Sequence, residues 1–191
     1  MIIGDKESLA SLATRALGDL AKVFAELAPG AEDPFVDALL AAKRIAVYGC
    51  GREGLQMKGF AMRLFHLGLD VHVVGDMTVP PLGPGDLLFV SSGPGALNTG
   101  DALIAVAREA GAKIAVVTAQ PDGRTSVRAD VRFYIPAQTM ANDQSGALSV
   151  LPMGSLFETA QMVLFEIIVL TLRERLGETA ETMRARHTNL E

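Results

Sequence analysis

The sequence predicts an α/β fold in which helices cover both faces of a five-stranded, doubly wound parallel sheet. Three observations carry this prediction. Short apolar runs alternate with helical patterns of about a dozen residues, the order expected of β-α-β units. The first run ends in glycines spaced G-x-G-x-x-G, at Gly49, Gly51 and Gly54, and a helical pattern follows at once. A later run ends in the turn Ser91-Ser92-Gly93-Pro94-Gly95.

Two helices precede the first predicted strand. Residues 5–27 carry apolar side chains at helical spacing, namely Leu9, Leu12, Ala16, Leu20, Val23 and Leu27. Residues 33–42 form a shorter helix, with Asp33 as its N-cap and Pro34 at its first position. We expect this N-terminal extension to pack against a partner subunit or across the sheet.

The alternating region supplies the sheet. The predicted strands are residues 45–48, 70–74, 86–90, 113–118 and 131–135. Helices are expected over residues 54–67 and 99–110, with a short helical turn at 124–129. The residues of the first of these helices expected to point inward are Leu55, Ala61, Met62 and Phe65. After the last strand we expect a loop at 138–152, a long helix at 153–176 ended by Gly177, and a short helix at 178–186.

Composition narrows the class of protein. The 191 residues are enough for one domain with a full core, and 49% hydrophobic with 20% charged residues is typical of a compact chain. A formal net charge of −5, without a long Lys/Arg cluster, argues against nucleic-acid binding. The single Cys50 excludes an internal disulfide and favours the cytoplasm. We expect no leader and no membrane span, because the apolar stretch 162–172 is interrupted by Glu166 and a span needs about 20 residues.

Both glycine-containing turns follow strands of the predicted parallel sheet, at the edge where such sheets bind ligands. Glycines and a helix start expose backbone N–H groups that attract an anion, which favours a phosphate-facing turn. Hydroxyls of Ser91 and Ser92, with Asn98 and Thr99 beyond them, suit the same ligand. The alternative is an ordinary turn whose residues serve as turn formers and N-caps.

Glu158 is a candidate general base. It lies near the start of the long helix, where a carboxylate commonly interacts with the helix N-terminus. Its apolar neighbours favour a pocket that raises its pKa toward general-base use. The residues alone leave these two interpretations even.

Three histidines remain. His66 and His72 have no neighbouring ligand pattern, so no metal site is expected. His187 lies in a C-terminal tail between basic residues. This tail is either solvated and frayed, or docked on another subunit where it delivers His187 to a phosphorylated substrate.

Four segments, residues 47–52, 60–68, 152–158 and 183–191, resemble the sugar isomerase (SIS) domain of 6-phospho-3-hexuloisomerases. The resemblance covers nearly the whole chain. It implies a three-layer α/β/α sandwich and a single SIS domain over 1–191, divided into N-terminal helices (1–42), a parallel core (43–136) and a C-terminal region (137–191). It also implies a cytoplasmic homo-oligomer, usually a tetramer.

The resemblance further implies an activity. Members interconvert 3-hexulose 6-phosphate and fructose 6-phosphate through an enediol, without a metal or organic cofactor, in the ribulose monophosphate route. Glu158 matches the base that moves the carbon-bound proton, and His187 matches a histidine that reaches a neighbouring subunit's site. The residues expected to contact the sugar phosphate are Gly49, Gly51, Arg52, Ser91, Ser92, Gly93, Asn98 and Thr99.

This chain departs from the family pattern in both turns. The family usually has Ser-Gly-Ser-Gly-Glu/Arg-Thr where this chain has Ser92-Gly93-Pro94-Gly95-Ala96-Leu97, so Pro94 and Leu97 remove hydrogen-bond donors. Glu53 stands where serine is common and adds negative charge beside the expected anion. The alternatives are therefore a non-catalytic sugar-phosphate binding protein, a protein for an unphosphorylated ligand, or an isomerase of another substrate such as a sugar acid.

Overall fold

A computed structural model describes residues 7–143 and 149–190. Five parallel strands form one sheet in the order β2-β1-β3-β4-β5, which confirms the predicted sheet. The strands are β1 (Ile45–Tyr48), β2 (Val71–Val73), β3 (Leu87–Ser91), β4 (Lys113–Thr118) and β5 (Val131–Tyr134). Since the chain passes from β1 to β2 on one side and to β3 on the other, the strand order reverses between β1 and β3. A ligand crevice is expected at the carboxyl ends of these two strands.

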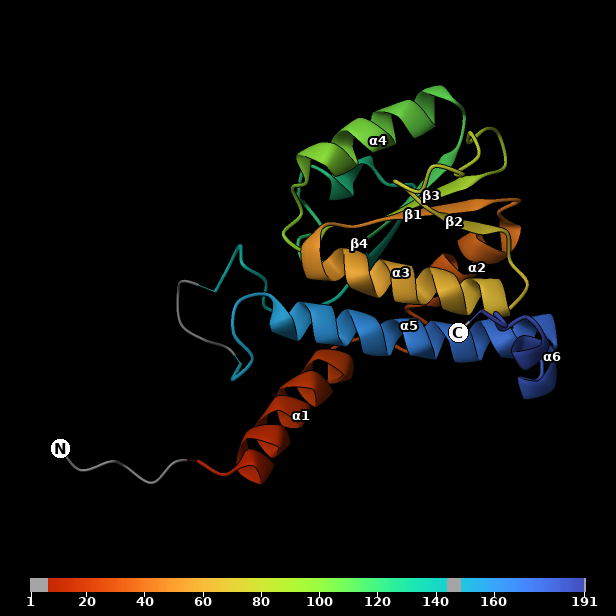
Figure 1. Cartoon of the computed structure of the whole chain (residues 1–191). Helices are drawn as coiled ribbons and strands as arrows, with labels where there is room; N and C mark the ends of the chain where they lie inside the picture. The colour runs from red at the N-terminus through yellow and green to blue at the C-terminus, as the bar shows by residue number, and fades with distance from the viewer. Residues whose placement is uncertain (1–6, 144–148, 191) are drawn as a thin grey trace.

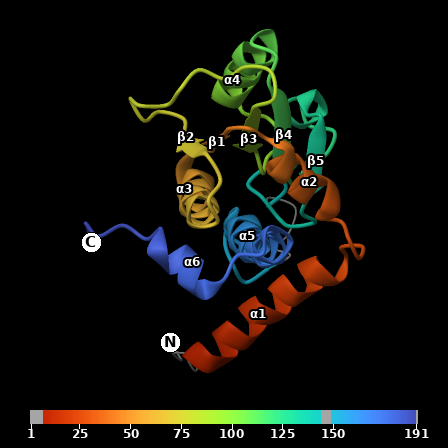
Figure 2. The same cartoon turned by 90° about the vertical axis from the view of Figure 1, so that its right-hand side faces the viewer.

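Helices cover both faces of the sheet and give the expected three layers (Figures 1 and 2). One layer contains α2 (Asp33–Ala41), α3 (Gly51–His66) and α5 (Ser155–Leu176), and the other contains α4 (Asn98–Glu109) with the 3-10 turn η1 (Ser126–Arg128). The chain also forms α1 (Leu9–Ala25) and α6 (Ala180–Ala185). Residues 5 and 6 of the predicted first helix, and 144–148 of the predicted loop, lie outside the described residues.

Alternating strand residues build two cores. On β3, Leu87 and Phe89 face α2, α3 and α5, whereas Leu88 and Val90 face α4. Phe89 is fully buried, and its ring centroid lies 4.7 Å from that of Phe35 and 5.7 Å from that of Phe165. The central strands are thus apolar on both faces, as a covered parallel sheet requires.

The first turn of α3 packs closely on the end of β1. The helix begins at Gly51, three residues before the predicted start, with Cys50 as an extended N-cap. A Cβ at Gly54 would lie 2.5 Å from the carbonyl oxygen of Gly49, so this position has no room for a side chain. The glycine spacing therefore reflects the contact between the helix and the strand end.

The predicted inward face of α3 is wrong for three of its four residues. Ala61 is buried, but Leu55, Met62 and Phe65 are exposed. The buried side chains are instead Met57, Phe60, Ala61 and Leu64. Apolar residues form two stripes on this helix, and only one of them faces the sheet, so hydrophobic spacing alone could not select it.

The longest helix, α5, packs against α3. It is long and apolar enough to cross a membrane by length and composition, but half of its most apolar window is buried inside the domain. Its buried side chains include Phe157, Leu164, Phe165 and Ile168. Packing in the domain core therefore accounts for the buried half of this apolar helix.

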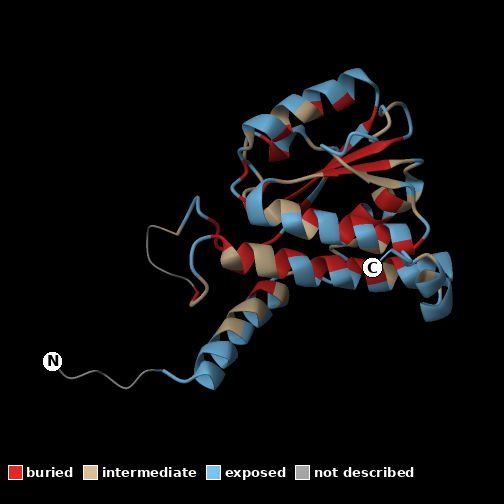
Figure 3. Ribbon diagram, viewed as in Figure 1, coloured by how far each residue is buried: buried red, intermediate tan, exposed pale blue. Residues whose placement is uncertain are grey.

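Among the described residues, it is the C-terminal part of α1 that packs against the hydrophobic core. Val23 is buried and Leu20 packs against the core, whereas Leu9 is 85% exposed and Leu17 is 66% exposed. The N-terminal part of the helix projects away from the sheet, as Figures 1 and 3 show. Of the six residues in the predicted apolar stripe, Leu9 and Leu12 are exposed.

We expect Phe89→Ala to lower the free energy of unfolding by about 3–5 kcal/mol, because it opens a cavity between β3, α2 and α5. Urea denaturation followed by circular dichroism measures the change. Phe65→Ala is the matched control, since this ring is half-exposed, and should cost less than half as much. Equal losses from the two variants would contradict the assignment of Phe89 to the centre of the core.

Candidate active site

Three segments meet at the carboxyl ends of β1 and β3: the first turn of α3, the turn after β3, and the first turn of α5. Contacts among Arg52, Glu53, Ser91, Gly93 and Glu158 connect them. The segments come from three separate parts of the sequence. This cluster lies where the reversal of strand order places a ligand.

Glu158 lies in the first turn of α5 and is largely buried. Its Oε2 forms an ion pair with Arg52 Nε at 2.7 Å, and Arg52 Nη1 donates to Ser155 Oγ at 3.3 Å. No capping hydrogen bond from a side chain is found at the described start of α5. The carboxylate therefore faces the α3 turn and its arginine, as a site residue would.

The backbone just before Glu158 is strained. Met153 has a φ of 56°, and it is the only non-glycine residue with positive φ in the described ranges. Such a conformation costs of order 1–3 kcal/mol and persists where the surrounding structure imposes it. A Cβ at the next residue, Gly154, would lie 3.4 Å from Glu158 Oε1. The local chain thus brings α5 into the site at an energetic cost.

The side chain of Glu53 is hydrogen-bonded to the turn after β3. Its Oε2 accepts from Ser91 Oγ at 2.5 Å and from the Gly93 N–H at 2.9 Å. Ser91 Oγ also lies 3.3 Å from Gln161 Oε1, but one hydroxyl proton serves the shorter contact to Glu53. Burial raises the pKa of Glu53, the two hydrogen bonds partly oppose this, and the charge of Glu158 adds to the rise.

The serine turn itself is tightly packed. A Cβ at Gly93 would lie 2.7 Å from the Phe157 ring and 2.8 Å from Glu53 Oε1, so glycine is required there. Ser92 is buried, and its Oγ has no hydrogen-bond partner among the described residues. Ser91 and Ser92 are both predicted from the sequence to offer hydroxyls to a phosphate. In the structure the Ser91 hydroxyl donates to Glu53 instead, and the Ser92 hydroxyl is buried.

Helix α4 begins with Asn98 and Thr99. It covers the face of the sheet opposite to α3, the helix that carries Glu53. Asn98 Oδ1 accepts from Arg124, which also pairs with Asp101 at 2.7 Å. Thr99 hydrogen-bonds the Tyr48 phenol, and the pKa of Tyr48 is raised chiefly by its contact with Cys50. The start of α4 thus adjoins the end of β1.

Sequence reasoning missed four polar neighbours of the candidate residues: Tyr48, Arg124, Ser155 and Gln161. Gln161 carried a usable signal, because a polar residue within an apolar helical run, three positions after Glu158, is unusual. Tyr48 ends a predicted strand at the ligand edge, which is a similar signal. Arg124 is positioned by a loop, which sequence periodicity does not describe.

His187 lies at the opposite end of α3 from Glu53. Its ring stacks on that of His66 with centroids 5.2 Å apart, while Arg186 donates to the His66 carbonyl at 2.9 Å and pairs with Glu178 at 2.8 Å. This arginine lowers the pKa of Glu178 to about 2. The length of α3, about 20 Å, separates His187 from the Arg52 end. The structure does not bring His187 to Glu158 of the same chain.

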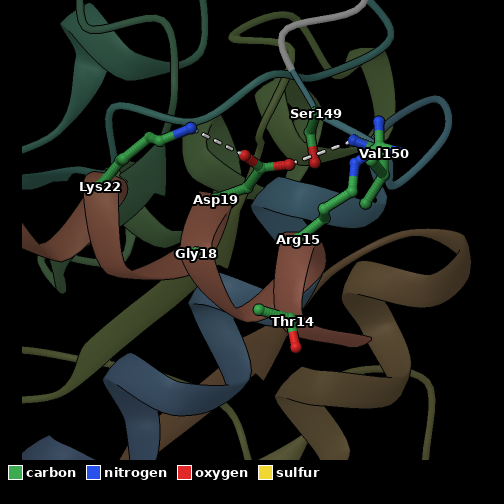
Figure 4. A pocket seen from close by; sticks show the side chains of 7 residues that line it. All are labelled: Thr14, Arg15, Gly18, Asp19, Lys22, Ser149 and Val150. Atoms are coloured by element: carbon green, nitrogen blue, oxygen red, sulfur yellow. Dashed lines mark hydrogen bonds and ion pairs between the residues drawn. The ribbon is translucent and has the colours of Figure 1, made fainter. Parts of the chain in front are cut away.

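A separate hollow adjoins α1 (Figure 4). Its lining residues are Thr14, Arg15, Gly18, Asp19, Lys22, Ser149 and Val150. Asp19 accepts from the Val150 N–H and from Lys22, both at 3.1 Å, and hydrogen bonding, chiefly from Ser149, lowers its pKa. These contacts hold α1 to the segment before α5, and none of the candidate site residues lines the hollow.

Within the described residues, no group of three or more His, Cys, Asp or Glu side chains is arranged to hold a metal ion.

Glu53 predicts a pH-dependent stability. Because its pKa is raised on folding, the protonated form is favoured in the folded state, and this contribution is full below the unfolded pKa of about 4.3. It is lost as pH rises through the folded pKa. We therefore expect the free energy of unfolding of Glu53→Gln, relative to the parent chain, to increase as pH rises from about 4 and to level off once the pH passes the folded pKa of Glu53. Denaturant titrations at several pH values measure this difference, with Glu166→Gln as a control that shows a smaller trend; a difference independent of pH contradicts the prediction.

Comparison with known proteins agrees with this geometry. Residues 38–163 match the model of the SIS domain family. A Bacillus subtilis protein named 3-hexulose-6-phosphate isomerase is 35% identical over 159 residues, covering 83% of this chain and 86% of the relative. A Mycobacterium gastri protein of the same name is 40% identical over 164 residues, covering 83% and 82%.

Solved structures give the same result. The structure of a Methanococcus jannaschii protein, from which a function of 3-hexulose-6-phosphate isomerase was inferred, superposes with a TM-score of 0.79. The two chains are 25% identical, over 95% of this chain and 98% of that one. The switch-point cluster, the sheet order and these matches together show that the chain belongs to the SIS domain family.

Proposed function

We propose that the protein is a phosphosugar isomerase that interconverts 3-hexulose 6-phosphate and fructose 6-phosphate. The observation that carries the proposal is the largely buried Glu158 carboxylate, which lies at the switch point of the sheet beside Arg52. Relatives named 3-hexulose-6-phosphate isomerase, 35% and 40% identical over most of the chain, support the choice of substrate.

The reaction moves a carbonyl by one carbon. In the 3-ketose, a base removes the proton on C2, and the electron pair forms the C2–C3 double bond of an enediol. The carboxyl group so formed delivers a proton to C3 after its own proton has had time to exchange with solvent, while a hydroxyl proton moves from the C2 oxygen to the C3 oxygen, and the product is the 2-ketose. The two sugars have the same atoms and oxidation state overall, so a carboxylate that takes and returns one proton is sufficient as the carbon base.

In this mechanism Glu158 is the base for the carbon-bound proton. Arg52, held between Glu158 and Ser155, orients the carboxylate and offers positive charge to the developing enediolate oxygen. Asn98 and Thr99, at the start of α4, face the phosphate end of the sugar together with the α4 N-terminus. The remaining walls of the proposed sugar-phosphate site are formed by Gly49, Gly51 and the Ser91–Gly93 turn.

His187 acts on hydroxyl protons in the site of a second copy of the chain. Its distance from the Arg52 end of its own α3 supports a role between subunits. Exposed apolar side chains offer surfaces for the partner, on α3 (Leu55, Met62 and Phe65), on α5 (Met162 and Leu170) and on α1 (Leu9 and Leu17). We infer a homo-oligomer, a tetramer by family resemblance, acting in the cytoplasm in the ribulose monophosphate route.

A second candidate is a non-catalytic or altered-specificity sugar-binding protein. The specific observation in its favour is that Glu53 accepts the hydrogen bonds of Ser91 and Gly93, the two groups expected to donate to a phosphate. Turnover distinguishes the two candidates, because a binding protein does not exchange carbon-bound protons.

Purified protein in heavy water should incorporate deuterium at C3 of fructose 6-phosphate, as followed by NMR. Glu158→Gln should slow this exchange by at least about 100-fold, because the amide cannot accept the proton. Glu166→Gln, which removes a carboxylate paired with Arg63 further along α5, should exchange like the parent chain. Folded parent protein without any exchange would overturn the isomerase proposal.

A second prediction concerns the neighbouring subunit. Glu158→Gln and His187→Asn should each reduce turnover by about 100-fold or more. Oligomers assembled from both variants should regain up to about a quarter of the parent activity, since some sites then receive both native residues from different chains. Full activity of His187→Asn alone, or no recovery in the mixture, would argue against a shared site.

A further inference from the structure

The turn after β3 already contains a negative group that belongs to the chain. Glu53 Oε2 accepts both the Ser91 hydroxyl and the Gly93 N–H, at 2.5 Å and 2.9 Å. These are the donors that a turn at a strand end would otherwise offer to an external anion. A phosphate oxygen at this position would have to displace a carboxylate held by two hydrogen bonds.

No ion pair joins Glu53 to a cation among the described residues. Arg52, its neighbour in the sequence, is directed to Glu158 and Ser155 instead. The charge of Glu158 also acts on Glu53, so the cluster holds two carboxyl groups and one guanidinium. An incoming anion at this turn would meet repulsion in a partly buried setting, where charges are weakly screened.

The other oxygen of Glu53 has a different role. Oε1 accepts no hydrogen bond from any described residue, and it borders Gly93, where a Cβ would lie 2.8 Å from it. An ionised carboxylate oxygen only accepts hydrogen bonds, so its partner must carry an N–H or O–H group. Sugar hydroxyls are such groups, and phosphate dianions are not.

We propose that Glu53 determines specificity by making the turn after β3 a hydroxyl-binding subsite that excludes anions. A polyhydroxylated ligand binds there through an O–H donated to Oε1, and any phosphate it carries lies away from the Ser91–Gly93 turn. The exclusion of anions follows from the geometry of the turn, whereas the identity of the ligand as a sugar phosphate rests on the proposed function.

Sulfate is a suitable probe of the exclusion, because its charge is constant between pH 5 and pH 8. Calorimetric titration should show that Glu53→Ala binds sulfate at least about tenfold more tightly than the parent chain, since the substitution removes the charge and frees both donors. Glu166→Ala, a matched loss of one carboxylate, should leave sulfate affinity unchanged. Equal sulfate affinity in the parent chain and a folded Glu53→Ala would overturn the proposal.

Glu53→Gln keeps the shape of the side chain and serves if the alanine variant does not fold. Its amide oxygen can still accept from Ser91 and Gly93, so removal of the charge alone should tighten sulfate binding by about threefold or more. No gain in this variant would also contradict the proposal.

Unphosphorylated D-fructose tests the hydroxyl contact. Its affinity should fall at least about fivefold in Glu53→Ala, opposite to the change for sulfate, because a hydrogen bond to a charged acceptor is lost. Fructose affinity that is unchanged or improved would overturn the hydroxyl subsite. Neither titration depends on turnover. An inactive parent chain would therefore refute the proposed function, whereas the sulfate titration would still test the role of Glu53.

Discussion

The ion pair between Arg52 and Glu158 holds the site together, because it joins the first turns of α3 and α5 across the carboxyl edge of the sheet. Glu158 is largely enclosed, and a buried charge is stable only with a partner. Arg52 can reach it only because α3 begins at Gly51, directly against the end of β1, and Gly54 allows that close approach. The glycine spacing therefore matters less as a phosphate signature than as the condition for bringing an arginine to a carboxylate.

The same arrangement leaves Glu53 without a cationic partner in the described part of the chain and shapes the electrostatics of the site. With Arg52 committed to Glu158, the hydrogen bonds of Ser91 and Gly93 are what stabilise the Glu53 carboxylate, and burial raises its pKa against them. The turn after β3 thus holds a carboxyl group of the chain itself, and the proposed function assigns the phosphate of the ligand to the start of α4, where helix N–H groups lie.

The sequence predicted the sheet well and the helix faces poorly, for a physical reason. The bounds of β1 and β4 are as predicted, because strands covered on both faces are continuous apolar runs bounded by polar or glycine residues. The sequence of α3 contains two apolar stripes, and in the folded chain only the one with Met57 and Phe60 packs against the core. The environment of Glu158 was undecidable from its neighbours, because its partner Arg52 lies in a distant segment that only the fold brings near. The role of Glu53 was hidden for the same reason.

The position of His187 limits what one chain can do alone. Arg186, paired with Glu178 and bound to the His66 carbonyl, fixes the tail at the end of α3 remote from Arg52. The role proposed for His187 therefore requires a second copy of the chain, and the exposed apolar residues of α1, α3 and α5 are the surfaces proposed for contact between copies. In that arrangement subunit association and catalysis are linked by mass action: dilution that separates the subunits removes His187 from the site while Glu158 and Arg52 stay paired.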